Sequence, residues 1–291
     1  MDIDLLKTFI EVHRARHFGR AARQLFLTQS AVSARIRLLE DRLGVQLFNR
    51  KRNDIQLTPA GARLLKYAEN MVITWERARQ EVCLEPQFTE SLAIGALVDL
   101  WDILLQEWLH RVHATLASVA LRAEAHTTEA LIRKVLDGVL DLAFVFEPPS
   151  LPDLVIRETA RVELVMVSTR AGQRVDQALQ DDYVMVDWGV AFEMSHARYF
   201  PDAPAPALHM GLGNQALRFL LARGGAAYLA SGLIQALPGQ NRLWPVEGAP
   251  MIERLVHVLY RAGSSRESLI ERVLKLFGDP EITASGEHEH P

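Results

Sequence analysis

A chain of 291 residues is longer than one hydrophobic core usually supports, which predicts two or three domains. Hydrophobic residues make up 49% and charged residues 23% of it, a composition that excludes wholesale disorder and a collagen-like fibre. The net charge of −4 is unevenly divided: residues 1–58 hold 11 Lys and Arg against 6 Asp and Glu, whereas the remainder holds 21 against 30. A basic head on an acidic body is typical of a nucleic-acid-binding module joined to a part that does not bind nucleic acid.

The compartment follows from cysteine usage and from the first residues. The single cysteine, Cys83, cannot form an internal disulfide, and the opening MDIDLLKTF carries acids where a signal peptide carries cations. No stretch reaches the roughly 20 uncharged apolar residues that span a bilayer. We therefore expect a cytoplasmic protein that does not bind membranes.

Three patterns divide the chain. Residues 1–58 contain short helical repeats that end in a basic turn, and residues 59–88 contain one long helical pattern. Over residues 89–278, short β-branched strands alternate with amphipathic helices, which predicts βα units and a mainly parallel sheet. Residues 279–291 lack periodicity and are expected to form a loose tail. The fold class is therefore α/β with an all-α-type head.

The head predicts a helix-turn-helix motif. Its third helix is expected to begin after Thr28, a capping residue, and to end before Gly44. One side of this helix is apolar, and the other side and its flanks carry small, hydroxyl, amide and guanidinium groups: Gln29, Ser30, Ser33, Ala34, Arg35 and Arg37. Such groups fit a DNA major groove, because amide and guanidinium groups can form paired hydrogen bonds with base edges. The alternative is a generic surface helix with two arginines.

A small hairpin is predicted after this helix. Val45–Leu47 and Ile55–Leu57 flank a basic turn, and cations at a hairpin tip bind phosphates without reading sequence. The residues expected to contact DNA are Thr28, Gln29, Ser30, Ser33, Arg35, Arg37, Arg50, Lys51 and Arg52.

The stretch Phe18–Gly61 resembles the winged helix-turn-helix of LysR-type transcriptional regulators. It contains AAxxL, TQSAVS, IRLLE, LGxxLF and LTPAG in that family's order and spacing. The resemblance implies sequence-specific binding of double-stranded promoter DNA, dimers that commonly assemble into tetramers, and a two-lobed, periplasmic-binding-protein-like domain that binds a small-molecule effector. Five residues match the family pattern directly, namely Gln29, Ser30, Ser33, Arg37 and Arg50.

Two positions depart from that pattern. Ala34 and Asn53 stand where many family members carry arginine, while Arg35 and Arg52 lie one position away. Individual base contacts are therefore not carried over to these four positions.

The long helical pattern predicts a dimer. Thr58 is a natural cap, and Pro59 is a natural first residue for a helix that runs to Pro86, about 40 Å long. Its apolar stripe consists of Leu64, Leu65, Ala68, Met71, Val72, Trp75, Ala78 and Val82. Because no neighbouring segment supplies a matching helix, we expect the same helix of a second copy to cover the stripe. The alternative, packing against the chain's own head, would use about one turn.

The body predicts two βα lobes that form a clamshell. Expected strands are Ser91–Ala96, Val119–Ala123, Asp141–Phe146, Glu163–Ser168, Val184–Val186, Ala226–Leu229 and Leu255–Tyr260; expected helices are Leu100–Val112, Thr128–Leu136, Asn214–Arg223 and Ser265–Phe277. Ligands of such sheets lie beyond the carboxyl ends of strands and against helix starts. The candidate effector-binding residues are therefore Val98, Asp99, His126, Thr127, Thr128, Glu147, Asp187 and Trp188.

The chemistry of this cleft leaves alternatives open. Thr127 and Thr128 match the position where family members often bond an effector, although one of them could simply cap its helix. Asp99, Glu147 and Asp187 would make the cleft acidic and therefore unsuited to a simple carboxylate ligand, unless these residues pair with arginines or face solvent.

The body also resembles the HdfR-like subgroup of the family. The resemblance lies in Leu100-Trp101, Trp108-Leu109, Leu140–Leu142, Glu147–Pro149 and Trp188-Gly189 with Phe192. Aromatic residues seven apart on a helix are also typical of an ordinary core.

Three short motifs that resemble metal-binding, dinucleotide-binding or catalytic sites are incomplete in this sequence. His110 and His113 lack a third metal ligand, the pair Gly211-x-Gly213 does not complete a dinucleotide motif, and Ser195-His196 lies in no nucleophile elbow. We expect no enzymatic activity, cofactor or bound metal; the expected partners are promoter DNA, an effector, a second copy and RNA polymerase. The rivals are a clamshell enzyme or solute-binding protein with a helical appendage, and an architectural DNA-binding protein.

Overall fold

The computed structural model describes residues 2–51, 54–82, 85–235, 237 and 243–277. The chain divides into two compact units, residues 1–86 with 137–139 and residues 87–136 with 140–291. Arg52, Cys83 and the expected tail at residues 279–291 lie outside the described residues. Within the described part of the chain, no helix is long and apolar enough to cross a membrane.

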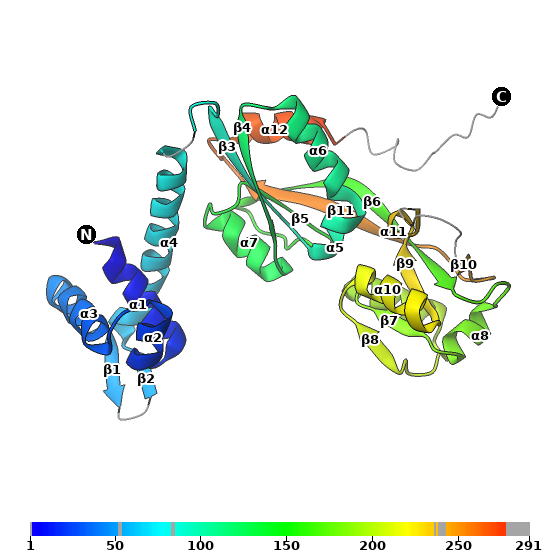
Figure 1. The fold of residues 1–291 in the computed structure, drawn as a ribbon, viewed down its shortest axis with the longest axis horizontal. Coiled ribbons are helices and arrows are strands. Elements are labelled where there is room, and N and C mark those ends of the chain that lie inside the picture. Colours follow the sequence, from blue (N-terminus) through cyan, green and yellow to red (C-terminus); the bar gives the residue numbers. More distant parts are fainter. Residues whose placement is uncertain (1, 52–53, 83–84, 236, 238–242, 278–291) are drawn as a thin grey trace. The chain divides into compact units, whose positions relative to one another are not determined.

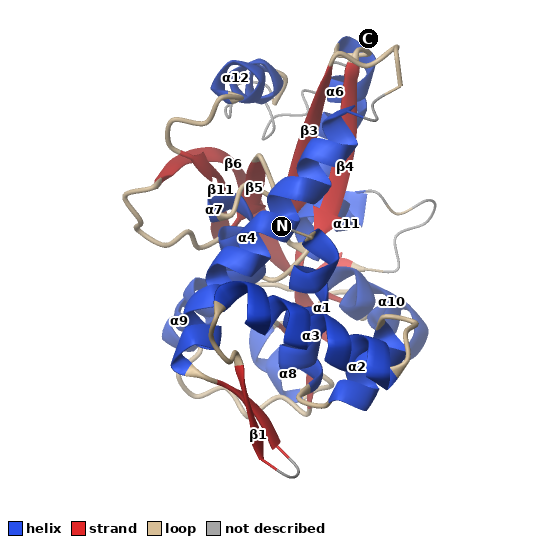
Figure 2. Cartoon of the chain, turned by 90° about the vertical axis from the view of Figure 1, so that its left-hand side faces the viewer, coloured by secondary structure: helices blue, strands red, loops and turns tan. Residues whose placement is uncertain are grey.

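The head consists of four helices and a hairpin (Figures 1 and 2). The elements are α1 (Ile3–Ala15), α2 (Phe18–Gln24), α3 (Gln29–Leu43), β1 (Phe48–Lys51), β2 (Asp54–Leu57) and α4 (Pro59–Val82). Their core is a single cluster in which Phe9, Ile36 and Phe48 are fully buried. Figure 2 shows the hairpin projecting from these helices.

Local signals in the sequence fix the ends of these helices. The Thr28 hydroxyl accepts a hydrogen bond from the Ala31 amide at 3.2 Å, and Gly44 ends α3 in a left-handed conformation with φ of 68°. The Thr58 hydroxyl accepts from the Gly61 amide at 3.0 Å and so caps α4. All three expectations are confirmed.

The hairpin starts later than predicted. Its first strand begins at Phe48, whereas a strand was expected over Val45–Leu47. The Leu47 amide donates to the Glu40 carboxylate at 2.8 Å, so it is bound to α3, while the Leu47 carbonyl accepts from the amide of Thr58, directly after β2, at 2.9 Å.

Helix α4 packs against the head by its first half. Leu64, Leu65, Ala68 and Val72 contact the head's core cluster, and α1 is the neighbouring helix. The expectation that no segment of the chain covers the stripe is therefore wrong for these four residues, which extend over more than two turns. The Lys7 ammonium also pairs with the Glu76 carboxylate at 2.5 Å, one turn further along.

The second unit contains the remaining elements. They are β3 (Glu90–Ala96), α5 (Val98–Leu100), a π-helix (Trp101–Leu105), α6 (Gln106–Thr115), β4 (Val119–Ala125), α7 (Thr128–Leu136), β5 (Leu142–Val145), β6 (Leu154–Ser168), α8 (Val175–Gln180), β7 (Val184–Val186), α9 (Val190–Tyr199), β8 (Leu208–Met210), α10 (Gly213–Arg223), β9 (Ala226–Ala230), α11 (Ser231–Gln235), β10 (Trp244–Pro245), β11 (Ile252–Arg261) and α12 (Glu267–Lys275).

One mixed sheet joins the two lobes of this unit (Figure 1). The strand order is β10-β6-β11-β5-β3-β4, with β9 also paired to β6. Strand β3 is parallel to β4 and β5, but β6 is antiparallel to β11, β9 and β10. The expectation of a mainly parallel sheet is therefore wrong, because the two longest strands run against each other.

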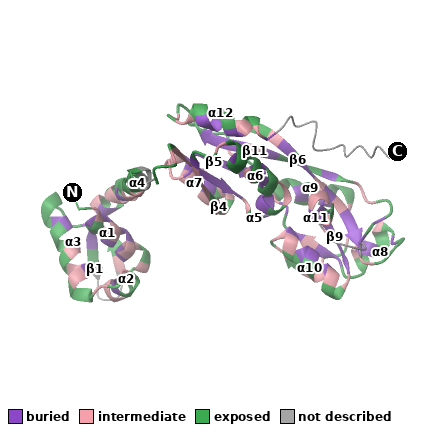
Figure 3. Cartoon of the chain, turned by 45° about the horizontal axis from the view of Figure 1, so that its top comes forward, coloured by how far each residue is buried: buried purple, intermediate pink, exposed green. Residues whose placement is uncertain are grey.

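The long strands β6 and β11 run through both lobes. In Figure 1, lobe 1 contains β3, β4, β5, α7 and α12 with the helices between β3 and β4, and lobe 2 contains the elements from α8 to β10. The register of β6 and β11 shifts between Val256 and His257. Figure 3 shows buried residues along the strands of both lobes.

An aromatic cluster forms part of the core of lobe 1. The Trp108 ring lies 5.1 Å from the Phe144 ring and 5.5 Å from the Phe277 ring, and its indole donates to the Val273 carbonyl at 3.0 Å. The helix α12 is thereby fixed to α6.

Candidate nucleic-acid interface and effector cleft

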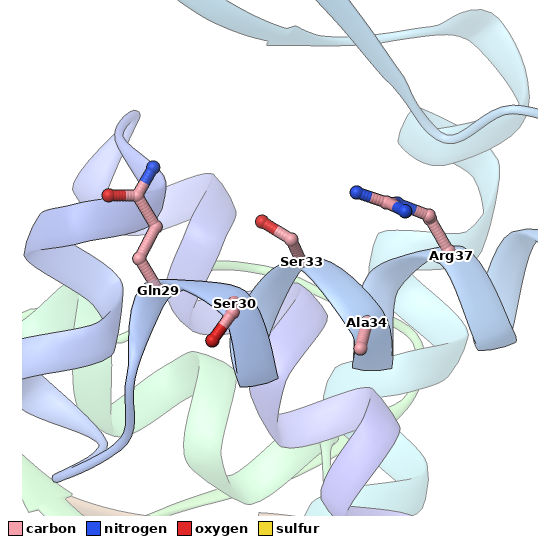
Figure 4. Close-up of a pocket in the computed structure, with 5 residues that line it drawn as sticks. All are labelled: Gln29, Ser30, Ser33, Ala34 and Arg37. Atoms are coloured by element: carbon pink, nitrogen blue, oxygen red, sulfur yellow. The ribbon is translucent and has the colours of Figure 1, made fainter.

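The outward face of α3 carries a shallow hollow (Figure 4). Its lining residues are those predicted to face a major groove, with the exception of Arg35: Gln29, Ser30, Ser33, Ala34 and Arg37. Four of the five are exposed and Ser33 is half-buried. The structure thus brings small and hydrogen-bonding side chains together at the start of this helix.

The two arginines of α3 differ in their surroundings. Within the described residues, Arg37 forms no hydrogen bond or ion pair, and its guanidinium is exposed beside the hollow. Arg35 instead donates to the Thr8 hydroxyl at 3.3 Å and lies 3.7 Å from the Asp4 carboxylate, both on α1. In this structure the Arg35 side chain thus joins α3 to α1, and its contact with DNA stays a prediction.

The other residues expected to contact DNA are Thr28 and the three cations of the hairpin turn. The Thr28 hydroxyl is occupied by the helix cap and by the Ser30 hydroxyl, 3.0 Å away. Arg50 and Lys51 lie in β1 opposite Ile55 and Asp54, but their side chains are outside the described part of the chain, as is Arg52.

Asp99 forms a contact between the two lobes. This residue lies on α5 in lobe 1, and its carboxylate accepts a hydrogen bond from the amide of Gly213, at the start of α10 in lobe 2, at 2.8 Å. The side chain is buried, and this burial raises the pKa of Asp99 to about 6, although the Gly213 bond lowers it. Alongside, the Asn214 amide donates to the Asp102 carboxylate at 3.1 Å.

A second bridge is formed by Glu147, which follows β5. Its carboxylate accepts from the Ala191 amide of α9 at 2.8 Å and from the Arg254 guanidinium of β11 at 2.9 Å. Arg254 is buried, donates also to the Trp188 carbonyl, and lies 4.9 Å above the Phe146 ring. Burial lowers the pKa of Arg254, and the Glu147 charge opposes this effect.

Sequence reasoning missed Arg254. Ile252, Arg254, Val256 and Val258 alternate along β11, and all four are buried. An arginine at an inward position of an alternating strand was the signal that could have revealed it.

Trp188 was expected to line the cleft. It belongs instead to the core of lobe 2. It is fully buried, and its indole donates to the Tyr228 carbonyl at 2.9 Å. Val98 and Asp187 are exposed, and the Asp187 carboxylate accepts from the Gly189 amide at 2.9 Å.

The remaining candidates lie at the carboxyl end of β4. Strands β3, β4 and β5 end side by side, since Ala96 is opposite both Ala125 and Phe144. Thr128 begins α7, and the Thr127 carbonyl accepts from the Leu131 amide at 2.9 Å. Binding of an effector by either hydroxyl stays a prediction.

His126 is part of an ionic cluster around Glu124. The Glu124 carboxylate lies 2.7 Å from the His126 ring nitrogen, 2.8 Å from Lys134 and 3.0 Å from Arg122. Burial raises the pKa of Glu124, but these neighbours outweigh burial and lower it. His126 is therefore engaged at the surface of lobe 1.

Comparison with known proteins places both units in one family. The family described as bacterial regulatory helix-turn-helix protein, lysR family, matches residues 3–62, and the LysR substrate binding domain matches residues 86–279. The chain belongs to the LysR family of bacterial regulators.

Curated relatives agree with this assignment. HdfR, an HTH-type transcriptional regulator, is 36% identical to the chain in both Yersinia enterocolitica and Yersinia pestis, over 94% of this chain and 96% of each relative. The resemblance to HdfR is thus confirmed. The chain is a LysR-type transcriptional regulator with a DNA-binding and an effector-binding domain, and it is not an enzyme.

Solved structures share the fold of this LysR-type regulator. CbnR is 17% identical with a TM-score of 0.69, covering 96% of this chain and all of CbnR. Vibrio fischeri DarR, solved in complex with DNA, is 19% identical with a TM-score of 0.57, covering 96% of this chain and 99% of DarR.

Gly213 is expected to tolerate no side chain in this regulator. A Cβ atom there would lie 2.4 Å from a ring carbon of the buried Trp188. We expect Gly213→Ala to lower the free energy of unfolding by about 1–3 kcal/mol in urea titrations, because a packed ring must move.

Gly211 offers a matched control. Gly211 lies two residues earlier, and a Cβ atom there would meet no atom of the described residues within 4 Å. Gly211→Ala is expected to leave stability unchanged within about 0.5 kcal/mol. Equal destabilisation by both substitutions would contradict the role assigned to Trp188.

Proposed function

We propose that this regulator acts as a dimer, or as a tetramer of paired dimers, that places two copies of α3 on neighbouring half-sites of a promoter. A small molecule in the interlobe cleft changes the relative placement of the two heads and hence transcription. The observation that carries this proposal is an exposed apolar stripe on α4. RNA polymerase is the expected further partner at the promoter, and the bacterial cytoplasm, where the chromosome lies, is the expected compartment.

The exposed stripe begins beside the part of α4 that the head covers. It consists of Tyr67, Met71, Trp75, Ala78 and Val82, and Trp75 and Val82 are 51% and 86% exposed. At roughly 100° per residue these five positions fall within an arc of about 80°. In the described part of the chain, the head covers this side of α4 at Leu64, whereas Trp75 and Val82 further along stay exposed. A second α4 supplies a matching apolar surface, as in two-stranded helical pairs.

The DNA-binding part of the proposal is supported by α3. Its first turns carry an amide at Gln29 and, at Arg37, a guanidinium without a partner among the described residues; such groups form bidentate bonds with adenine and guanine edges. Cations at Arg50, Lys51 and Arg52 are placed by sequence on the hairpin, where they would hold phosphates. A dimer of such heads binds half-sites about one helical turn apart, or a multiple of it.

The effector part of the proposal is supported by the two bridges in the cleft. Asp99 and Glu147 of lobe 1 accept bonds from the amides of Gly213 and Ala191 in lobe 2. A ligand can shift the lobes only through different affinities for two arrangements, typically about 1–3 kcal/mol. An anionic effector would have to displace the chain's own carboxylates, so we expect an effector that is not a simple carboxylate. Thr127 and Thr128 are the hydroxyls proposed to contact it.

Sedimentation of the full chain tests the proposal. We expect the wild type to form dimers at micromolar concentration, and we expect Trp75→Glu to weaken self-association at least about tenfold, because a charge would be buried in the helix pair. Affinity for a selected promoter site should fall in parallel. Lys66→Glu is the matched control, since Lys66 is exposed on the opposite face of α4.

Two outcomes would contradict the proposal. A wild type that sediments as single chains, with and without DNA, would exclude the dimer. Equal affinity for promoter and random DNA would favour the architectural role, because a specific regulator prefers its site by roughly 10³-fold or more.

A further inference from the structure

The hollow on α3 has two rows of side chains. Figure 4 shows Gln29, Ser33 and Arg37 pointing to one side of the helix and Ser30 and Ala34 pointing to the other. At roughly 100° per residue, Ala34 lies opposite the buried Val32 and Leu39, near the middle of the outward face. A nucleic-acid base that meets this face squarely therefore meets Ala34.

The neighbours of Ala34 set the width of the contact. Gln29 and Arg37 are eight residues apart, which is about 12 Å along the helix. This distance matches three to four stacked bases at roughly 3.4 Å each. The long polar side chains of Gln29 and Arg37 thus lie at the two ends of a short run of bases, and the small residues of the hollow lie between them.

Ala34 is the one lining residue without a polar side-chain atom. A methyl group facing an amino group or carbonyl of a base would remove that group from water without giving it a hydrogen bond, at a cost of about 1–3 kcal/mol. The C5-methyl of thymine is the apolar group that a base presents in the major groove, and alanine is a side chain that contacts it.

The acidic residue Asp41 favours base contacts at the first turns of α3 over contacts at its later turns. Asp41 lies seven residues after Ala34, at nearly the same angle, and it is exposed. Its carboxylate repels phosphates, so the duplex is favoured over the first turns of α3, where the exposed Arg37 lies.

We propose that Ala34 is a specificity-determining residue that selects a thymine, whose C5-methyl packs into the hollow between Ser30 and Arg37. Gln29 and Arg37 then read the bases on either side of this thymine. The inference rests on the proposed function, because it assumes that α3 enters a major groove.

Removal of single thymine methyl groups tests the inference. The full chain first selects its site from random DNA, and each thymine of one half-site is then replaced by deoxyuridine, which lacks only the C5-methyl. We expect one position to lose about three- to fourfold in affinity, the value of one buried methyl group. With Ala34→Gly the same replacement should cost less than about 1.5-fold, since the contact is already absent.

Ala31→Gly is the matched control for helix weakening. It places the same poor helix former in α3 but outside the hollow, so it should keep the deoxyuridine profile of the wild type. Comparing the two variants on the same DNA also cancels any effect of deoxyuridine on DNA shape.

Two results overturn the inference. One is a wild type for which no thymine methyl matters, and the other is an Ala34→Gly variant whose profile equals that of the wild type. A chain that selects no DNA site at all would overturn the proposed function instead, so the two failures are distinguishable.

Discussion

Asparagine at position 99 is expected to raise the free energy of unfolding of the effector domain by about 2–3 kcal/mol above pH 6, and to change it little below pH 4. Asp99 is only 7% exposed, and burial raises its pKa from 3.8 to about 6. Burial disfavours the charged carboxylate. Asparagine has the same shape, keeps an oxygen to accept the Gly213 amide, and carries no charge.

The direction of the pH dependence follows from proton binding. The folded domain holds the Asp99 proton more tightly than the unfolded chain does, because the pKa is higher in the folded state. Stability from this group is therefore present below about pH 4 and is lost as the pH rises to about 6. The asparagine variant has no such proton, so the difference between the two proteins should grow across this window and then stay constant.

Urea titrations of the full chain between pH 4 and 8 measure this difference. Unfolding of the domain is followed by the fluorescence of Trp101, Trp108 and Trp188, which are buried in it. Asp202→Asn is the control, because Asp202 is an exposed acid in lobe 2. A loss of stability at pH 7 on Asp99→Asn would show that the charged bond to Gly213 outweighs the cost of burial.

A buried acid that costs stability at neutral pH is typical of functional sites. Asp99 connects the first turn of α5 in lobe 1 to the first turn of α10 in lobe 2. Its charge is therefore placed where a ligand in the cleft would change the contact between the lobes. This placement explains why the residue belongs in the effector part of the proposed function.

Helix ends were predictable from the sequence because their causes are local. The Thr28 cap, the Gly44 terminus and the Thr58-Pro59 start each depend on backbone within a few residues. The first half of β6 was missed for the opposite reason. Its residues Arg157 and Glu158 are exposed and break the apolar alternation, and pairing with β11 keeps this segment extended.

Periodicity identified the apolar stripe of α4 but not what covers it. A helical repeat shows which side is apolar, whereas the partner depends on how α1 is placed by the rest of the head. Ala68 and Val72 consequently pack against the head's own core, while Trp75 and Val82 stay exposed.

The sequence predicted cleft residues only from the positions at which strands end. The rule that ligands lie beyond carboxyl ends identified Asp99 and Glu147, which the structure places at the contact between lobes. The rule gives no side-chain direction, so it also selected Trp188, which turns into the core of lobe 2. Arg254 was missed because it lies within β11 and not beyond the carboxyl end of a strand.

Arg254→Met is expected to destabilise the effector domain by about 2–3 kcal/mol. The Arg254 side chain is 4% exposed, and it binds the Glu147 carboxylate, the Trp188 carbonyl and the Phe146 ring together. Methionine fills the space of the aliphatic stem but leaves the carbonyl without its donor. Glu147 is half-exposed and regains water, so its pairing adds little to the cost.

Lysine at the same position separates charge from shape. The planar guanidinium reaches Glu147 and Trp188 at once, whereas an ammonium is a single point of charge, so Arg254→Lys should lose about half as much stability as the methionine variant. Arg261→Met, at the exposed end of β11, should change stability by less than about 0.5 kcal/mol.

Hydrogen exchange adds an independent readout, because the Ala191 amide is protected by a carboxylate that Arg254 holds in place. Faster exchange at Ala191 in both Arg254 variants would show that the bridge between lobes has opened, and unchanged exchange would assign Arg254 to packing alone.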